Sequence, residues 1–182
     1  MRKIFLLFFI YLLSSSHSFS NDEVLKSLKE GNKLVFIRHA LAPGSGDPEN
    51  FDINTCSTQR NLNNVGIEQS KKIGSIFKIN KIKIDEIYSS EWCRCKDTAK
   101  YAFKHFKTFD ALNSFYDISF SANEDKQIKD FNNFIKTIDG KNNVIFVTHY
   151  VVIAAILNIG TSSGEIVVTD KNLNIIGSID TL

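Results

Sequence analysis

Two short apolar runs, residues 33–37 and 143–148, stand out from an otherwise mixed polar sequence. Both are rich in valine, isoleucine and phenylalanine, and neither alternates with polar residues. This pattern is typical of strands that are buried on both faces of a parallel sheet. A third, less apolar strand is predicted at residues 84–89, directly before Ser90.

Apolar residues at helical spacing mark the segments between these strands. In the clearest case, residues 124–138, Ile128, Phe131 and Ile135 fall on one face. Further helices are predicted at residues 22–30, 64–77 (capped by Asn63), 91–106 and 151–157, and a hairpin at residues 165–169 and 174–179. Strands that alternate with helices predict a three-layer α/β/α fold with a mostly parallel sheet. Such a sheet binds ligands beyond the carboxyl ends of its strands.

The first twenty residues differ from the rest of the chain. Arg2 and Lys3 precede an apolar run that ends at residue 13, and a serine-rich stretch follows it. This order is typical of a secretory signal peptide, and the run is shorter than the roughly 20 residues of a transmembrane helix. We expect a signal peptide at residues 1–20 and one domain at residues 21–182. An uncleaved anchor is the alternative.

The expected export defines where the protein acts. A cleaved signal peptide predicts a periplasmic or secreted protein without stable membrane insertion. The full chain has 22 basic and 20 acidic residues, and both basic residues of the signal segment are lost on cleavage, so the mature chain is neutral. A neutral chain gives no electrostatic reason to expect a nucleic acid partner. Any anion site must therefore be built from a few converging cations.

Three cysteines remain after the signal segment: Cys56, Cys93 and Cys95. An exported protein meets an oxidising compartment in which a disulfide persists. A bond between Cys93 and Cys95 would be strained, so we expect Cys56 to pair with one of them. The spacing does not match a structural zinc site.

The residues that carry chemistry follow the predicted strands. Arg38 and His39 end the first strand, Arg94 comes shortly after the second, and His149 follows the third. All four are therefore expected at one edge of the sheet. Guanidinium groups bind phosphate oxygens in a bidentate manner, and an imidazole can attack phosphorus. The pattern predicts a phosphate site with a candidate nucleophile.

Four segments in this order resemble the histidine phosphatase superfamily, which includes the phosphoglycerate mutases. They are residues 35–40 (V-F-I-R-H-A), 62–69 (L-N-N-V-G-I-E-Q), 89–99 (S-S-E-W-C-R-C-K-D-T-A) and 147–149 (V-T-H). Each segment is a weak signal alone, but together they cover nearly the whole mature chain. The resemblance implies a phosphoglycerate mutase-like fold.

An exported bacterial subgroup of that family shows further similarity. It shares the G-D-P loop at residues 46–48, the C-S-T-Q-R-N-L stretch at 56–62 and W-C-R-C at 92–95. Proteins of this subgroup are associated with phosphate groups of the lipopolysaccharide core. The resemblance therefore implies a small phosphorylated substrate, with an envelope sugar phosphate as one possibility that the motifs themselves do not determine.

The resemblance also implies a role for each matching residue. His39 is the nucleophile that becomes phosphohistidine, with its other ring nitrogen held by an acceptor such as a backbone carbonyl. Arg38, Arg94 and His149 bind the phosphoryl oxygens. Arg60 either joins this pocket or lies at the surface. The protein supplies the cations, so no metal and no cofactor is expected.

The general acid is the open point of this assignment. Relatives carry a glutamate where this chain has Asn113, and an amide cannot donate a titratable proton. We take Asp117 as the candidate acid, ahead of Glu91, Asp47 and Glu124. Without an acid, the enzyme needs a good leaving group, as in phosphohistidine or an acyl phosphate.

The leading hypothesis is therefore a phosphatase that hydrolyses a phosphomonoester through phosphohistidine on His39. One alternative is a phosphohistidine phosphatase. Another is a catalytically weak member of the family that binds phosphorylated envelope ligands without turning them over. A mutase is disfavoured because the chain is short, and a structural envelope protein would bind no phosphate.

Overall fold

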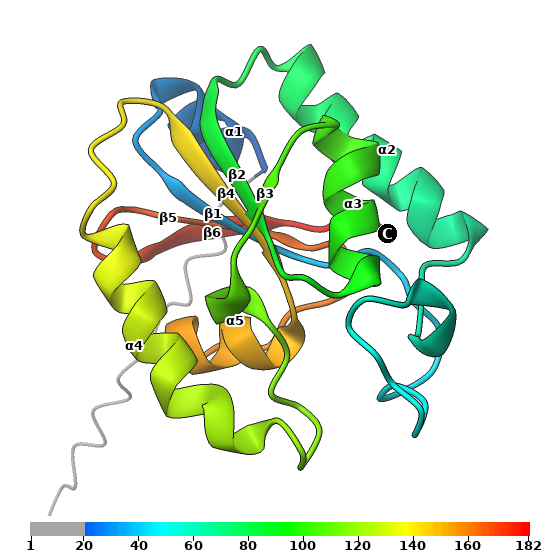
Figure 1. Cartoon of the computed structure of the whole chain (residues 1–182). Coiled ribbons are helices and arrows are strands. Elements are labelled where there is room, and N and C mark those ends of the chain that lie inside the picture. The colour runs from blue at the N-terminus through cyan, green and yellow to red at the C-terminus, as the bar shows by residue number, and fades with distance from the viewer. Residues whose placement is uncertain (1–20) are drawn as a thin grey trace, which may run out of the picture.

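The computed structural model describes residues 21–182, which form a six-stranded sheet between two helical layers (Figure 1). The strands are β1 (Leu34–Arg38), β2 (Ile84–Ser89), β3 (Lys107–Thr108), β4 (Asn143–Thr148), β5 (Ile166–Thr169) and β6 (Ile175–Ile179). Their order is β3-β2-β4-β1-β5-β6, with β1 to β4 parallel to one another and β5 antiparallel to both β1 and β6. The prediction of a mostly parallel sheet is confirmed, including the terminal hairpin. The short strand β3 was not predicted.

Helices cover both faces of this sheet. They are α1 (Asn21–Glu30), α2 (Asn64–Ile79), α3 (Cys93–Phe103), α4 (Glu124–Ile135) and α5 (Tyr150–Leu157). Side chains of a strand alternate between its two faces. Val35 and Ile37 of β1 accordingly pack with α1, α2 and α3, whereas Leu34 and Phe36 pack with α4 and α5. The expected three-layer architecture is therefore confirmed.

The helix boundaries follow from local chemistry. The side chain of Asn63 accepts a hydrogen bond from the N–H of Gly66 at 2.9 Å, which caps α2 as predicted. Helix α3 ends at Phe103, short of the predicted residue 106, because Lys104 adopts a φ of 72°. A residue in that region interrupts the helical hydrogen-bond ladder. Helix α4 likewise ends at Ile135, before the predicted residue 138.

The predicted signal peptide, residues 1–20, lies outside the described residues. Within residues 21–182, no helix has the length and apolar character needed to cross a bilayer.

Candidate active site

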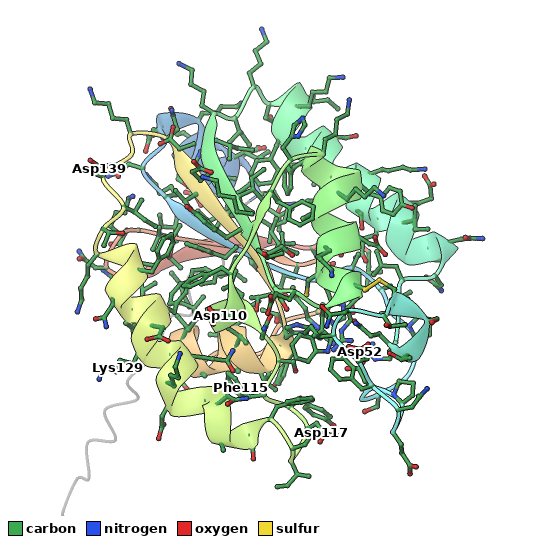
Figure 2. The ribbon with its side chains drawn as sticks, in the orientation of Figure 1. Asp52, Asp110, Phe115, Asp117, Lys129 and Asp139 are labelled. Atoms are coloured by element: carbon green, nitrogen blue, oxygen red, sulfur yellow. A yellow bond between two sulfur atoms is a disulfide. The ribbon has the colours of Figure 1, made fainter. Side chains whose placement is uncertain are left out.

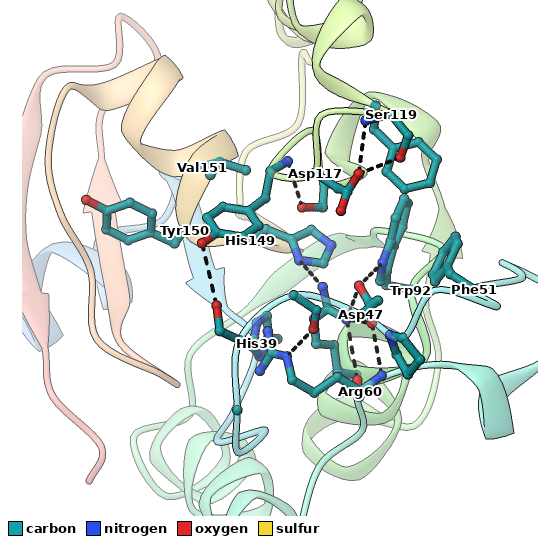
Figure 3. A pocket seen from close by; sticks show the side chains of 18 of the residues that line it. His39, Asp47, Phe51, Arg60, Trp92, Asp117, Ser119, His149, Tyr150 and Val151 are labelled. Atoms are coloured by element: carbon teal, nitrogen blue, oxygen red, sulfur yellow. Dashed lines mark hydrogen bonds and ion pairs between the residues drawn. The ribbon is translucent and has the colours of Figure 1, made fainter.

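The carboxyl ends of β1 and β4 bring two histidines together. Arg38 pairs with Thr148 in the parallel register, and the backbone N–H of His39 donates to the carbonyl of Thr148 at 2.8 Å. His39 directly follows β1, and His149 directly follows β4. Their ring centroids are 5.5 Å apart, and both rings line the same cavity (Figure 3). The predicted convergence of these segments is observed.

His39 is held as a neutral imidazole with one nitrogen available. Only 3% of the residue is exposed, and Nδ1 lies 2.8 Å from the carbonyl oxygen of Ala40. A carbonyl only accepts, so Nδ1 carries the proton and Nε2 keeps its lone pair. Burial, and then the neighbouring charge of Arg94, lower the pKa of His39 well below its usual value. The imidazole is therefore neutral at neutral pH, with a free lone pair on Nε2, as a nucleophile requires.

Three motif residues hold the backbone beside His39. Thr98 accepts a hydrogen bond from the Ala40 N–H at 3.0 Å and donates to the carbonyl of Arg94 at 2.7 Å. Gln69 accepts from the Leu41 N–H at 2.9 Å. Gly66 packs so closely that a Cβ there would collide with the carbonyl oxygen of Leu41. These motif positions therefore orient the nucleophile, a role that their spacing alone did not reveal.

Arg94 lies in the first turn of α3 and is 3% exposed. Its Nη1 donates to both carboxylate oxygens of Asp47, at 2.8 and 3.1 Å, and its Nη2 lies 3.5 Å from Nδ1 of His149. Its Nε is buried and has no partner among the described residues. A buried guanidinium with an unused donor beside two imidazoles is suited to an anionic ligand.

Asp47 is the residue that sequence reasoning undervalued. Besides Arg94, its carboxylate accepts from the backbone N–H of Arg60 at 2.9 Å and from the indole N–H of Trp92 at 3.0 Å. Burial alone would raise the pKa of Asp47, but these hydrogen bonds outweigh it and lower the pKa. Asp47 is therefore a permanent anion that holds Arg94. The sequence marked Asp47 only through the G-D-P loop and as an alternative candidate for the general acid.

His149 belongs to a buried hydrogen-bond network. Its Nε2 lies 2.9 Å from Oγ of Ser90, and Ser90 donates to the side-chain oxygen of Asn113 at 3.0 Å. Because Ser90 Oγ donates onward, Nε2 of His149 carries the proton and Nδ1 faces Arg94. Burial, and then the charge of Arg94, lower the pKa of His149 well below its usual value.

The other two predicted arginines also line the cavity. Arg38 donates from Nη1 to the carbonyl of Thr161 at 2.5 Å, and its guanidinium lies 5.5 Å from the ring centre of Tyr150. Arg60 donates from Nε to the carbonyl of Gly46 at 2.9 Å and from Nη1 to Ala42. Of the two positions considered for Arg60, the structure shows the pocket rather than the open surface.

Asp117 lies at the cavity mouth, in the loop before α4 (Figures 2 and 3). It is exposed, and its carboxylate accepts from the N–H and the hydroxyl of Ser119 at 2.9 and 2.6 Å. These bonds lower the pKa of Asp117, so the group is ionised at neutral pH. A general acid needs the opposite shift. The environment of Asp117 thus argues against the role predicted for it.

The other acid candidates are no better placed. Asn113 stands where the acid was expected, accepts from the N–H of Glu91 at 2.8 Å and donates to its carboxylate at 2.7 Å. Neither Glu91 nor Glu124 lines the cavity, which among carboxyl groups has Asp47, Glu49 and Asp117 in its wall. Both aspartates have lowered pKa values.

A disulfide fastens the loop that carries Asp47 and Arg60 to α3. It joins Cys56 to Cys93, which resolves the pairing that the sequence left open. Cys95 is a buried free thiol 3.4 Å from Nε2 of His149. Burial raises the pKa of Cys95 to about 12, so this thiol is not a nucleophile at neutral pH.

The fold and the site together define an α/β protein with a pocket lined by three arginines and two histidines. The family model of the histidine phosphatase superfamily (branch 1) matches residues 34–134. The chain therefore belongs to the histidine phosphatase superfamily. No curated protein sequence matches it significantly.

Solved structures show the same fold at low sequence identity. The protein histidine phosphatase SixA, solved with tungstate, is 13% identical with a TM-score of 0.60, over 82% of this chain and 97% of SixA. A phosphoglycerate mutase from Thermus thermophilus is 12% identical with a TM-score of 0.57, over 81% and 98%. A phosphoserine phosphatase from Entamoeba histolytica, solved as a histidine-to-alanine mutant with phosphoserine, is 18% identical with a TM-score of 0.53, over 75% and 89%.

Proposed function

We propose that the protein is a phosphatase in which Nε2 of His39 takes the phosphoryl group from the substrate. One observation carries the proposal: a neutral, oriented imidazole shares its cavity with three guanidinium groups and a second imidazole. Membership of the superfamily supports phosphatase activity in general. The residue roles and the substrate are inferred from the geometry.

In the first step, Nε2 of His39 attacks phosphorus. The new N–P bond forms while the bond from phosphorus to the leaving group breaks, and the leaving group departs with that electron pair. Arg38, Arg60 and Arg94 provide fixed donors for the three phosphoryl oxygens in the transition state. A bound phosphoryl anion raises the pKa of His149 and favours its donor form.

In the second step, water attacks the phosphohistidine. The new O–P bond forms, the N–P bond breaks, and its electron pair returns to His39 as the imidazole lone pair. The proton lost by the water passes to the phosphate product or to solvent. The carbonyl of Ala40 keeps Nδ1 protonated through both steps, so the same nitrogen is ready for the next cycle.

Hydrolysis of phosphohistidine or of an acyl phosphate is the second candidate within this chemistry. It is favoured because Asp47 and Asp117 of the cavity wall both have lowered pKa values, so an alkoxide leaving group would find no ready proton on either of them. An envelope sugar phosphate is correspondingly less favoured. The Cys56–Cys93 disulfide supports the proposal that the protein acts in the periplasm or after secretion.

The test is rapid-quench labelling of the purified protein with radioactive acetyl phosphate. The wild type is expected to form an acid-labile, base-stable adduct that maps to His39, and His39→Ala is expected to lose it entirely. His105→Ala is the matched control, because His105 is exposed and does not line the cavity. Tight vanadate binding without any adduct would show a phosphate sensor instead of an enzyme.

A further inference from the structure

We infer that the cavity contains a subsite for an aromatic leaving group, so that the preferred substrates carry the phosphoryl group on or next to a flat ring. This inference rests on the proposed function and adds the class of substrate. The cavity has a volume of about 690 Å³, which is the size of a pocket for a whole small molecule rather than for phosphate alone. The space beside the phosphate site therefore belongs to the rest of the substrate.

One wall of that space is built from three rings that pack against one another. Phe51 lies nearly parallel to Trp92, with ring centroids 5.0 Å apart, and Phe120 meets their edges at 5.5 and 5.6 Å. Trp92 is 3% exposed and is anchored by its bond to Asp47, whereas Phe51 and Phe120 are partly exposed. The two phenylalanines therefore add ring surface to the cavity that Arg94 and His149 also line. Figure 3 shows Phe51 beside Trp92.

Two tyrosines continue this surface around the cavity mouth. Tyr116 is 63% exposed and Tyr150 is 45% exposed, and both line the same cavity. The hydroxyl of Tyr116 lies 3.5 Å from that of Ser45, which brings the loops on either side of the mouth together. Exposed aromatic rings around a polar centre bind flat groups by stacking and edge contacts.

The proton chemistry of the site leads to the same class of leaving group. Asp47 and Asp117 have lowered pKa values, and Asn113 stands where an acid was expected. A phenolate, an imidazole or a carboxylate departs without strong acid assistance, whereas a sugar alkoxide does not. The aromatic wall favours a flat leaving group, whereas the lowered pKa values of the two aspartates favour a weakly basic one. A phenolate or an imidazole satisfies both observations.

The charged side chains that line the cavity narrow the class of leaving group further. Glu49 and Asp117 line the mouth and are exposed, so a second anionic group on the leaving group would face two carboxylates. Like charges that face each other repel. The leaving group that fits is therefore a neutral or cationic ring. The shared chemistry is phosphate on an aryl oxygen or on an imidazole nitrogen.

The test compares benzoyl phosphate with acetyl phosphate. Both release a carboxylate of similar basicity, so the ratio of their kcat/KM values isolates the contribution of the ring. The wild type is expected to prefer benzoyl phosphate by at least about tenfold, which corresponds to about 1.4 kcal/mol. In Phe51→Leu/Phe120→Leu the preference is expected to fall to within about twofold.

Two internal controls protect this comparison. Acetyl phosphate reports on the same protein sample, so a general loss of folding lowers both rates and leaves the ratio unchanged. Phe103→Leu removes a ring that packs against Phe77 in the core and does not line the cavity, and it is expected to keep the preference of the wild type.

The outcomes separate the subsite from the proposed function. If His39 is labelled by both donors at equal rates, the subsite is wrong and the phosphatase stands. The same holds if the preference survives in the double variant. If neither donor labels His39, both proposals fail. Phenyl phosphate and N-phosphoimidazole distinguish an aryl oxygen from an imidazole nitrogen as the atom that carries the phosphate. Turnover of at least one of them supports the substrate class, and the absence of turnover for both contradicts it.

Discussion

The cavity is built from two kinds of structure that hold their residues in different ways. Arg38 is the last residue of β1, His39 and His149 directly follow β1 and β4, and the parallel register of the two strands places all three. Asp47 and Arg60 belong instead to the long loop between β1 and α2. The comparison shows that the nucleophile depends on the sheet, whereas the residues that complete its surroundings depend on a loop that must itself be fastened.

The fastening of that loop is specific. Its contacts with α3 include the Cys56–Cys93 disulfide, the ion pair between Asp47 and Arg94, and the Cys93 N–H, which donates to the side chain of Gln59 at 2.9 Å. All three contacts end within two residues of one another on α3. The part of the site that the loop carries is thus held at the start of α3. Substitutions at these contacts test whether the histidines on the sheet function independently of the loop.

The largest expected effect comes from removing the disulfide. The bridge closes a loop of 37 residues, and its loss in Cys56→Ser/Cys93→Ser is expected to lower the free energy of unfolding by about 3 kcal/mol. For a domain of this size, the Tm falls by roughly 10 °C. Calorimetry measures this directly.

Reduction provides the control for that prediction. Dithiothreitol should lower the Tm of the wild type by a similar amount and leave the double variant unchanged. Cys95 does not interfere, because it is buried and its pKa is raised to about 12. Equal Tm values for the oxidised and reduced wild type would show that the loop is held by its other contacts alone.

The next effect concerns Asp47, which connects the loop to the sheet-borne histidines through Arg94. Asp47→Asn keeps an acceptor for the Arg60 N–H but removes the charge that faces the buried guanidinium. Loss of a partner that orients a metal ligand typically costs about 10–100-fold in activity, and we take the same range for a residue that orients Arg94. We expect kcat for acetyl phosphate to fall within this range, measured by steady-state kinetics at neutral pH.

A second carboxylate of the same loop is the control. Asp52 is exposed, bonds to Asn54 and Thr55 within the loop, and does not line the cavity (Figure 2). Asp52→Asn is expected to stay within about twofold of the wild-type kcat, as surface changes usually do. A faster Asp47→Asn enzyme would mean that Asp47 competes with phosphate for Arg94 instead of positioning it.

The same contrast explains what the sequence could predict. Arg38, His39 and His149 were predictable because they stand at the ends of apolar strands, and the carboxyl ends of parallel strands meet at one edge. The pairing of Arg94 with Asp47 was not predictable, because Asp47 lies 47 residues away in the sequence. The position of its carboxylate depends on the path of the loop between β1 and α2. The edge strand β3 has only two residues, which carry no periodic signal.

The cysteine pairing shows why rotation about a helix matters. Residues two apart on a helix are related by a rotation of about 200° about the helix axis, so their side chains point to nearly opposite sides. The thiol of Cys95 points to the Thr148 carbonyl and His149, whereas that of Cys93 points to the loop and bonds to Cys56. The sequence limited the choice to these two residues, but only the packing of α3 on the sheet decides between them. The aromatic wall was missed for the same reason, since Phe51 and Phe120 meet only in the folded chain.

The smallest expected effect is that of Asp117→Asn, which tests the residue first taken as the general acid. The pKa of Asp117 is lowered, so its carboxylate is ionised near neutral pH and has no proton to donate. We expect kcat/KM for benzoyl phosphate to change by less than about threefold between roughly pH 5 and 8, as for an exposed group outside the reaction.

The shape of the pH profile makes this last test decisive. If Asp117 donated a proton, kcat/KM would fall as pH rose through its pKa, and Asp117→Asn would remove that decline together with most of the rate. With the assignments made above, the profile instead falls only on the acid side, as His39 becomes protonated below its usual pKa. An alkaline decline that disappears in Asp117→Asn would restore this loop residue to the reaction. The loop would then supply chemistry itself and not only hold Arg94 and the substrate against the sheet.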